Sequence, residues 1–239
     1  MWTDYVTVNS LDEAVRLLGQ HGPAARIIAG ATDLLLELER GVRQSVGTLI
    51  DISRVQGIDR IALDEAGVLH LGPMVTHGQC ASSKLVIEQA FPLAKAAWEV
   101  GAPQIRARGT IAGNLITASP ANDTIPALMA LGAELTLRSV QGERRVPLAD
   151  FYTGVRKTVM RPDEVLVDIA IRPMGENQRG TFYKLGLRRA QAISVVNAAV
   201  VLTLENAQVA KAVITLGSVA PTIIHAVQAE ASLIGKELD

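Results

Sequence analysis

Two segments of the sequence combine small residues with hydrogen-bonding side chains, a mixture suited to holding a phosphate-bearing ligand. The first runs from Ile27 to Leu34 and reads IIAGATDL, an apolar strand pattern followed by a small-residue turn and the start of a helix. Gly30 and Ala31 allow a ligand to approach the backbone, and the N–H groups of such a turn suit a pyrophosphate. Taken alone, this segment favours a plainer explanation, a strand-to-helix turn in which Thr32 or Asp33 caps the helix.

The second segment, residues 101–126, is unusual for a connector because it is rich in small, polar and apolar residues together. Its hydrogen-bonding groups are distributed along one path: Thr110, Asn114, Thr117, Ser119 and Asp123. An extended polar ligand threaded along a backbone kept bare by Gly109, Ala112 and Gly113 would explain this composition. A long Ω-type loop whose polar groups bond to one another would explain it equally well.

The local signatures of other enzyme classes are absent from the sequence. It contains no G-x-G-x-x-G, G-x-x-x-x-G-K-[ST], H-E-x-x-H, C-x-x-C or G-x-S-x-G motif. The single cysteine, Cys80, excludes an internal disulfide, an iron–sulfur cluster and a cysteine-rich zinc site within this sequence. The histidines show no metal-ligand spacing, so we expect surface or hydrogen-bonded side chains at each of them: His21, His70, His77 and His225.

The composition predicts a globular protein that does not bind nucleic acid and has no membrane span. The net charge is −1, and only two Trp, three Tyr and three Phe are available to stack on bases. The start of the sequence lacks the basic-then-apolar pattern of a signal peptide. The longest apolar stretch, residues 192–204, is too short to span a bilayer. We therefore expect a cytoplasmic protein.

The order of predicted elements places the first segment in a small α/β lobe. Residues 3–52 alternate strand, helix, strand, helix and strand, and Ser10 and Glu13 form a capping-box pattern at the first helix. From residue 57 the pattern changes to hairpins and helices, typical of a mostly antiparallel sheet with helices on it, and includes a helix over 78–100 interrupted at Pro92. Residues 173–179 resemble a linker, followed by three strands and an amphipathic helix near 223–234. We divide the chain into an N-terminal lobe, a second lobe and a C-terminal domain: 1–56, 57–174 and 175–239.

Four segments together resemble the FAD-binding subunits of the xanthine dehydrogenase and carbon monoxide dehydrogenase family, the molybdenum hydroxylases. Ala29–Leu34 is similar to that family's A-G-G-T-D-L pattern, and residues 104–126 to its Q-I-R-N-R-G-T-I-G-G-N…A-S-P-x-x-D-x-x-P pattern. Residues 151–164 (FYTGVRKTVMRPDE) resemble F-x-x-G-x-R-K-T-x-L-x-x-x-E, and residues 182–190 (FYKLGLRRA) supply the fourth match. The matches follow one another in order over essentially the whole chain.

The resemblance implies an α+β fold, with a two-lobed FAD-binding part of the vanillyl-alcohol-oxidase (PCMH) type and a small α+β C-terminal domain. Because the sequence ends at Asp239, we expect that domain to be incomplete. The resemblance further implies which residues hold the cofactor. The pyrophosphate would be wrapped by Ile28, Ala29, Gly30, Ala31, Thr32, Asp33 and Leu34. The pyrophosphate and ribityl path would be lined by Thr110, Gly113, Asn114 and Ser119, with Asp123 on the ribityl or adenosine side. Met160 would pack on the cofactor, and Lys184 would lie near the pyrimidine edge of the flavin.

The function implied by the resemblance is electron transfer without a catalytic side chain in this subunit. Iron–sulfur clusters in a partner subunit would deliver single electrons to FAD, which would pass them to an acceptor such as NAD, a quinone or dioxygen, while substrate is hydroxylated at a molybdenum cofactor in another subunit. Ala31 and Ala112 stand where the family has glycine, and each added methyl group narrows the cofactor path. Two alternatives remain open: a free-standing FAD oxidase or reductase, and a scaffold subunit that has lost its cofactor.

Overall fold

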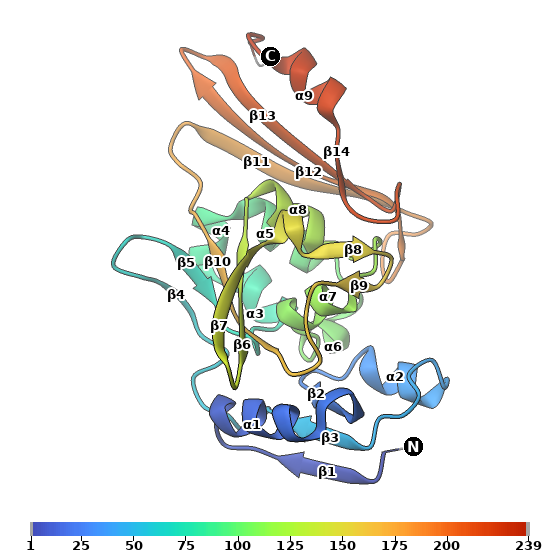
Figure 1. Cartoon of the computed structure of the whole chain (residues 1–239). Helices are drawn as coiled ribbons and strands as arrows, with labels where there is room; N and C mark the ends of the chain where they lie inside the picture. Colours follow the sequence, from blue (N-terminus) through green and yellow to red (C-terminus); the bar gives the residue numbers. More distant parts are fainter. Residues whose placement is uncertain (1, 238–239) are drawn as a thin grey trace.

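Three larger sheets follow one another along the molecule in the computed structural model, which describes residues 2–237 (Figure 1). A three-stranded sheet lies at the N-terminal end, a five-stranded sheet with its helices lies in the middle, and a four-stranded sheet with the last helix lies at the other end. This arrangement confirms the expected α+β class. In the described part of the chain no helix is long and apolar enough to cross a membrane, and no cluster of His, Cys, Asp and Glu could hold a metal ion.

The N-terminal sheet is parallel and has the strand order β1-β3-β2, and its strands alternate with helices along the chain as predicted. Ser10 begins the first helix by accepting a hydrogen bond from the N–H of Glu13 at 3.1 Å, and the helix buries Ala14, Val15 and Leu18 against the sheet. The elements are β1 (Asp4–Thr7), α1 (Leu11–His21), the 3-10 turn η1 (Gly22–Ala24), β2 (Ala25–Ile28), α2 (Leu34–Glu39) and β3 (Thr48–Asp51).

The middle sheet is antiparallel throughout, in the order β4-β5-β10-β6-β7, and its inner face packs on a group of short helices. Its strands are β4 (Ile61–Leu63), β5 (Leu69–Leu71), β6 (Glu134–Ser139), β7 (Gly142–Pro147) and β10 (Val165–Ile171), and a small hairpin, β8 (Tyr152–Gly154) and β9 (Lys157–Thr158), follows the turn η2 (Leu148–Asp150). The helices are α3 (His77–Ser82), α4 (Lys84–Gln89), α5 (Phe91–Trp98), α6 (Pro103–Arg106), α7 (Ile111–Thr117) and α8 (Thr124–Ala130).

The C-terminal sheet shares its core with the middle of the molecule. It is antiparallel in the order β11-β12-β13-β14, and Phe182, Ala199 and Val201 join the same buried cluster as the middle sheet and helices. Its elements are β11 (Gln178–Gly186), β12 (Ser194–Glu205), β13 (Gln208–Gly217), β14 (Ile224–His225) and α9 (Val227–Leu233). The sheet therefore lies on α5 and α8 rather than standing apart from them.

Two local predictions, and one of the alternatives left open for residues 101–126, were wrong. The helix expected over 78–100 is three helices, broken at Ser83 and Ala90, and Pro92 lies in the first turn of α5 rather than interrupting a helix. Proline is tolerated there because the first N–H groups of a helix have no intrahelical partner. Residues 101–126 are not an irregular loop, because α6, α7 and the start of α8 fall within them. Residues 173–179 end in strand, since β11 begins at Gln178.

Candidate cofactor site

The turn between β2 and α2 presents unpaired backbone donors. Within residues 2–237, the N–H groups of Gly30, Ala31, Thr32 and Asp33 donate to no protein acceptor. Ala31 holds φ at 63°, a left-handed conformation that costs an alanine about 1 kcal/mol. Asp33 stands at the start of α2 but makes no side-chain cap, so the plainer capping explanation fails for it. Burial, followed by the charge of Glu37, raises the pKa of the Asp33 carboxyl.

The two segments singled out in the sequence touch at this turn. An added Cβ at Gly30 would lie 1.9 Å from the carbonyl oxygen of Arg108 and 3.0 Å from Cα of Gly109. Gly109 in turn lies beside Thr32 and His77, since a Cβ there would be 3.4 Å from Oγ1 of Thr32 and 3.3 Å from Cδ2 of His77. The backbone of one segment therefore packs directly on the backbone of the other, which only glycine at position 30 allows.

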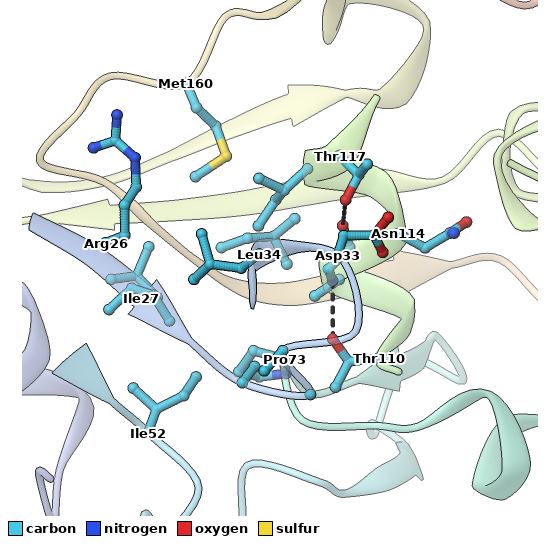
Figure 2. Close-up of a pocket in the computed structure, with 18 of the residues that line it drawn as sticks. Arg26, Ile27, Asp33, Leu34, Ile52, Pro73, Thr110, Asn114, Thr117 and Met160 are labelled. Carbon is cyan, nitrogen blue, oxygen red and sulfur yellow. Dashed lines mark hydrogen bonds between the residues drawn. The ribbon is translucent and has the colours of Figure 1, made fainter. Parts of the chain in front are cut away.

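The polar side chains of α7 partly satisfy one another. Thr110 caps α7 by accepting from the N–H of Gly113 at 2.9 Å, and the hydroxyl of Thr117 donates to the carbonyl of Gly113 at 2.9 Å (Figure 2). Asn114 accepts from the hydroxyl of Thr124 through its side chain at 2.6 Å. This is the mutual bonding that the loop alternative predicted, yet Thr110, Gly113 and Asn114 also line a cavity.

That cavity, of about 360 Å³, lies between the β2–α2 turn, the start of α7 and the segment around Met160. Figure 2 shows Arg26, Ile27, Leu34 and Met160 towards one side and Asp33, Asn114 and Thr117 towards the other. Ten of the residues predicted from the sequence line it: Ala29, Gly30, Ala31, Thr32, Asp33, Leu34, Thr110, Gly113, Asn114 and Met160. Ile28 does not line it, since this residue is buried at the end of β2, in the small cluster beneath α2.

The side of the cavity near α2 is closed by charged side chains that the sequence reading did not single out. The carboxylate of Glu37 pairs with the guanidinium of Arg156 at 3.1 Å and also with Arg43. The Arg156 pair joins α2 to the β8–β9 turn across a sequence separation of 119 residues. No local sequence pattern reveals such a pair, because a helix and a distant turn supply its two residues.

His77 is the cavity residue that corrects an expectation from the sequence. It was expected to be exposed or hydrogen bonded, but the side chain is 2% exposed and Nδ1 has no partner among the described residues. Burial, with the nearby charge of Arg106, lowers the pKa of His77 to about 4, so the ring is neutral at pH 7. The Thr76–Gln79 capping box marks the start of α3, but no local signal turns its first side chain towards residue 109.

Asp123, Lys184 and Ser119 lie outside the first cavity. Nζ of Lys184 bonds to Oδ2 of Asp123 at 2.6 Å, and both side chains are nearly buried. The other carboxylate oxygen of Asp123 accepts from Ser194 at 2.6 Å and from Asn197 at 2.9 Å. Ser119 accepts from the N–H of Ala121 at 3.4 Å. The Asp123 network ties β11 and β12 to the start of α8.

A second cavity, of about 650 Å³, lies on the side of α6 that faces the β11–β12 loop. Lys184 lines this cavity together with Trp98, Arg106, Arg188 and Arg189, and among the described residues Glu99 is the one acidic residue in the lining. The guanidinium of Arg106 stacks on the indole of Trp98 at 4.7 Å. Cationic groups therefore surround this cavity.

Comparison with known proteins gives two family matches that together cover nearly the whole chain. Residues 2–173 match the family described as "FAD binding domain in molybdopterin dehydrogenase", and residues 181–239 match "CO dehydrogenase flavoprotein C-terminal domain". The FAD subunit of nicotinate dehydrogenase from Eubacterium barkeri is 34% identical over 98% of this chain and 80% of its own length. The medium chain of carbon monoxide dehydrogenase from Hydrogenophaga pseudoflava is 31% identical over 98% and 80%. A solved structure of that enzyme, in a form that lacks the Mo-pyranopterin moiety of the molybdenum cofactor, superimposes with a TM-score of 0.93, at 32% identity, over 100% of this chain and 82% of the matched one.

Proposed function

Because the chain belongs to the FAD-binding subunits of the molybdenum hydroxylase family, we propose that it carries electrons from iron–sulfur clusters in one partner subunit to an acceptor such as NAD or a quinone. FAD is its cofactor, and the chain is a subunit of an oxidoreductase. Substrate hydroxylation belongs to a molybdenum-bearing partner. Bound FAD supplies the exchange between one-electron and two-electron partners, so this subunit needs no nucleophile or general base of its own.

The observation that carries the proposal is the bare backbone surface of the β2–α2 turn. Its N–H groups at residues 30–33 have no protein acceptor and line the first cavity. Adjacent unpaired N–H groups form a site for an anion, and a pyrophosphate satisfies several of them at once. These residues therefore fit the diphosphate of FAD, with Thr32 adding a hydroxyl. Leu34, Ile27 and Met160 offer an apolar wall beside it for the adenosine half.

We place the flavin end of the cofactor in the second cavity, on the other side of α6. Lys184 supports this placement because it lines that cavity and its ammonium group is fixed by two bonds, to Asp123 at 2.6 Å and to the carbonyl of Glu99 at 3.1 Å. A fixed positive charge favours negative charge on the pyrimidine edge of a flavin. Asp123 then acts by holding Lys184 in place. Direct contacts of Asp123 and Ser119 with the cofactor stay predictions from the sequence.

The test begins with the absorption spectrum of the purified chain and chromatography of the supernatant after denaturation. A flavin spectrum and released FAD are expected. A colourless protein that takes up no added FAD would instead make the chain a scaffold. The complex purified with its partners is then reduced with substrate, and reoxidation is timed with NAD, a soluble quinone and dioxygen in turn. Acceptor reduction driven by substrate in the isolated chain would replace the relay with a free-standing oxidase or reductase.

A further inference from the structure

His77 is a buried side chain whose two ring nitrogens both lack a protein partner among residues 2–237. Nδ1 is sealed from solvent and bonds to nothing. Nε2 makes no hydrogen bond either, but it is not among the sealed atoms, and the residue lines the first cavity. A buried polar atom without a partner costs about 1–3 kcal/mol, so its presence needs a reason.

The backbone around His77 fixes where the ring lies. The N–H of His77 donates to the carbonyl of Gly109 at 2.9 Å, and the N–H of Ile111 donates to the carbonyl of Val75 at 2.9 Å. These two bonds pin the start of α3 against the start of α7. The ring thus lies beside Gly109, on which Thr32 of the β2–α2 turn also abuts. His77 therefore lies where the unpaired amides of the β2–α2 turn approach the start of α7.

The chemical state of the ring follows from its surroundings. The guanidinium of Arg106 is the charged neighbour, and it is held in place by the carbonyls of Val100 and Gly101 and by Trp98. This positive charge and burial keep the ring uncharged at neutral pH. A neutral imidazole carries a proton on one of its two ring nitrogens. At a sealed position, an N–H without an acceptor costs more free energy than an unprotonated nitrogen without a donor. The proton therefore belongs on Nε2, the ring nitrogen that is not sealed, in a residue that lines the cavity.

We propose that His77 is a further cofactor-binding residue, which donates a hydrogen bond from Nε2 to a phosphate oxygen of FAD beside Thr32 and the turn amides. This inference rests on the proposed placement of the diphosphate in the first cavity. An uncharged donor at this point binds an anion without adding a second buried cation next to Arg106. The bond offsets the cost of the orphaned Nδ1, which an apolar side chain of the same size would avoid.

Two variants of similar volume separate binding from packing. His77→Leu removes both nitrogens, and His77→Gln keeps an N–H donor. We expect His77→Leu to weaken FAD binding about tenfold to a hundredfold, as the loss of a hydrogen bond to a charged partner does, and His77→Gln to recover most of it. FAD affinity is measured by quenching of flavin fluorescence on the cofactor-free chain. The melting temperature of cofactor-free His77→Leu should equal or exceed that of the unaltered protein, whereas a merely structural role predicts a lower one.

The unaltered protein gives a readout that no folding defect can obscure. With ¹⁵N-labelled histidine, the His77 signals are assigned by their absence in His77→Gln. FAD should shift Nε2 and raise the pKa of His77 from its low value of about 4, because an anion now faces the ring. Unchanged His77 signals, or equal FAD affinity in all three proteins, would overturn the role of His77.

The Gly30→Ala variant keeps this outcome distinct from a failure of the proposed site. If Gly30→Ala loses FAD while His77→Leu binds it normally, the cavity holds the cofactor and only the role of His77 is wrong. If Gly30→Ala binds FAD like the unaltered protein, the placement of the diphosphate itself is wrong.

Discussion

The contact between the β2–α2 turn and residues 108–109 makes Gly30→Ala the sharpest perturbation of the site. The new Cβ would meet the carbonyl oxygen of Arg108 at 1.9 Å and its carbon at 2.7 Å. Both are backbone atoms, so no side-chain rotation relieves the overlap. The turn and the segment must separate by about 1.5 Å before the closest contact reaches the ordinary 3.4 Å.

Such a separation lowers both stability and cofactor affinity. Forcing an extra carbon into a packed contact lowers the free energy of unfolding by about 1–3 kcal/mol. For a chain of this length, that lowers the melting temperature of the cofactor-free protein by roughly 3–10 °C. The turn amides also move relative to Thr110 and Gly113 on the far side of the cavity. Loss of a single charge-assisted hydrogen bond weakens FAD binding at least about tenfold.

The neighbouring residue offers a matched control of opposite sign. Ala31 has φ at 63°, where glycine is free of the strain that alanine bears. We expect Ala31→Gly to raise the free energy of unfolding by about 1 kcal/mol and to leave FAD binding intact or tighter. Melting curves of cofactor-free protein and the FAD content of purified protein test both variants side by side. The reasoning is refuted if Gly30→Ala melts and binds FAD like the unaltered chain, or if Ala31→Gly loses stability.

Three further networks of charged side chains are tested by substitution, two beside the cavities and one, at His70, in the middle sheet. Glu164→Gln should cost about 2–3 kcal/mol in urea unfolding at pH 7, because Glu164 is buried and bonded by two arginines that are themselves partly exposed. Burial raises the pKa of Glu164, but the bonds to the arginines outweigh burial, so the net pKa is lowered. The stabilisation is therefore present above pH 4.5, and the stability of the variant should converge with that of the unaltered protein as the pH falls below that value. A stability difference that does not change with pH would contradict this assignment. Lys184→Met should lower the free energy of unfolding by about 3 kcal/mol, because it leaves the Asp123 carboxylate buried without its cation. Adding Asp123→Asn should recover much of this loss. No recovery in the double variant would show that the two residues act separately. Burial lowers the pKa of His70, but hydrogen bonds to Asp168 and Asp64 outweigh burial and raise it above 6.5. His70→Asn should therefore lower the free energy of unfolding by under about 1 kcal/mol below pH 6.5, and by nothing once the pH exceeds the raised pKa. A loss of stability that grows with pH would contradict this sign.

Secondary structure was predictable where the chain shows a strong local period or a stop signal. The Ser10 cap and the apolar spacing of α1, the alternation of β6 and the long apolar run of β12 are such patterns, and the structure has these elements close to the expected bounds. Short helices such as α6 and α7 lack that period, because four and seven residues do not complete two turns of an amphipathic face. They were missed for this reason. The division of the chain at residues 56 and 174 stays a prediction.

The site was predictable only as far as its backbone is concerned. Small residues in the two segments indicated bare backbone, and ten of the expected residues do line one cavity. The ion pair of Glu37 with Arg156 depends on contacts between elements far apart in the sequence, and so do the buried position of His77 and the Asp123–Lys184 network. Such contacts leave no periodic trace in the chain. Lys184 was named only through the family resemblance, and its buried partners could not be inferred from either segment.

The small residues of the two segments therefore have two possible causes, close packing of backbone on backbone and binding of a ligand. Only the second indicates a cofactor. Gly30 is required by the approach of Arg108 whether or not a ligand is present, so a scaffold that had lost FAD would need it equally. His77 discriminates between the two possibilities, because an orphaned buried Nδ1 costs free energy that packing alone does not require. A chain without a ligand in this cavity would be more stable with an apolar side chain at position 77. The presence of imidazole there is consequently a stronger argument for a bound diphosphate than the glycine pattern that first indicated one.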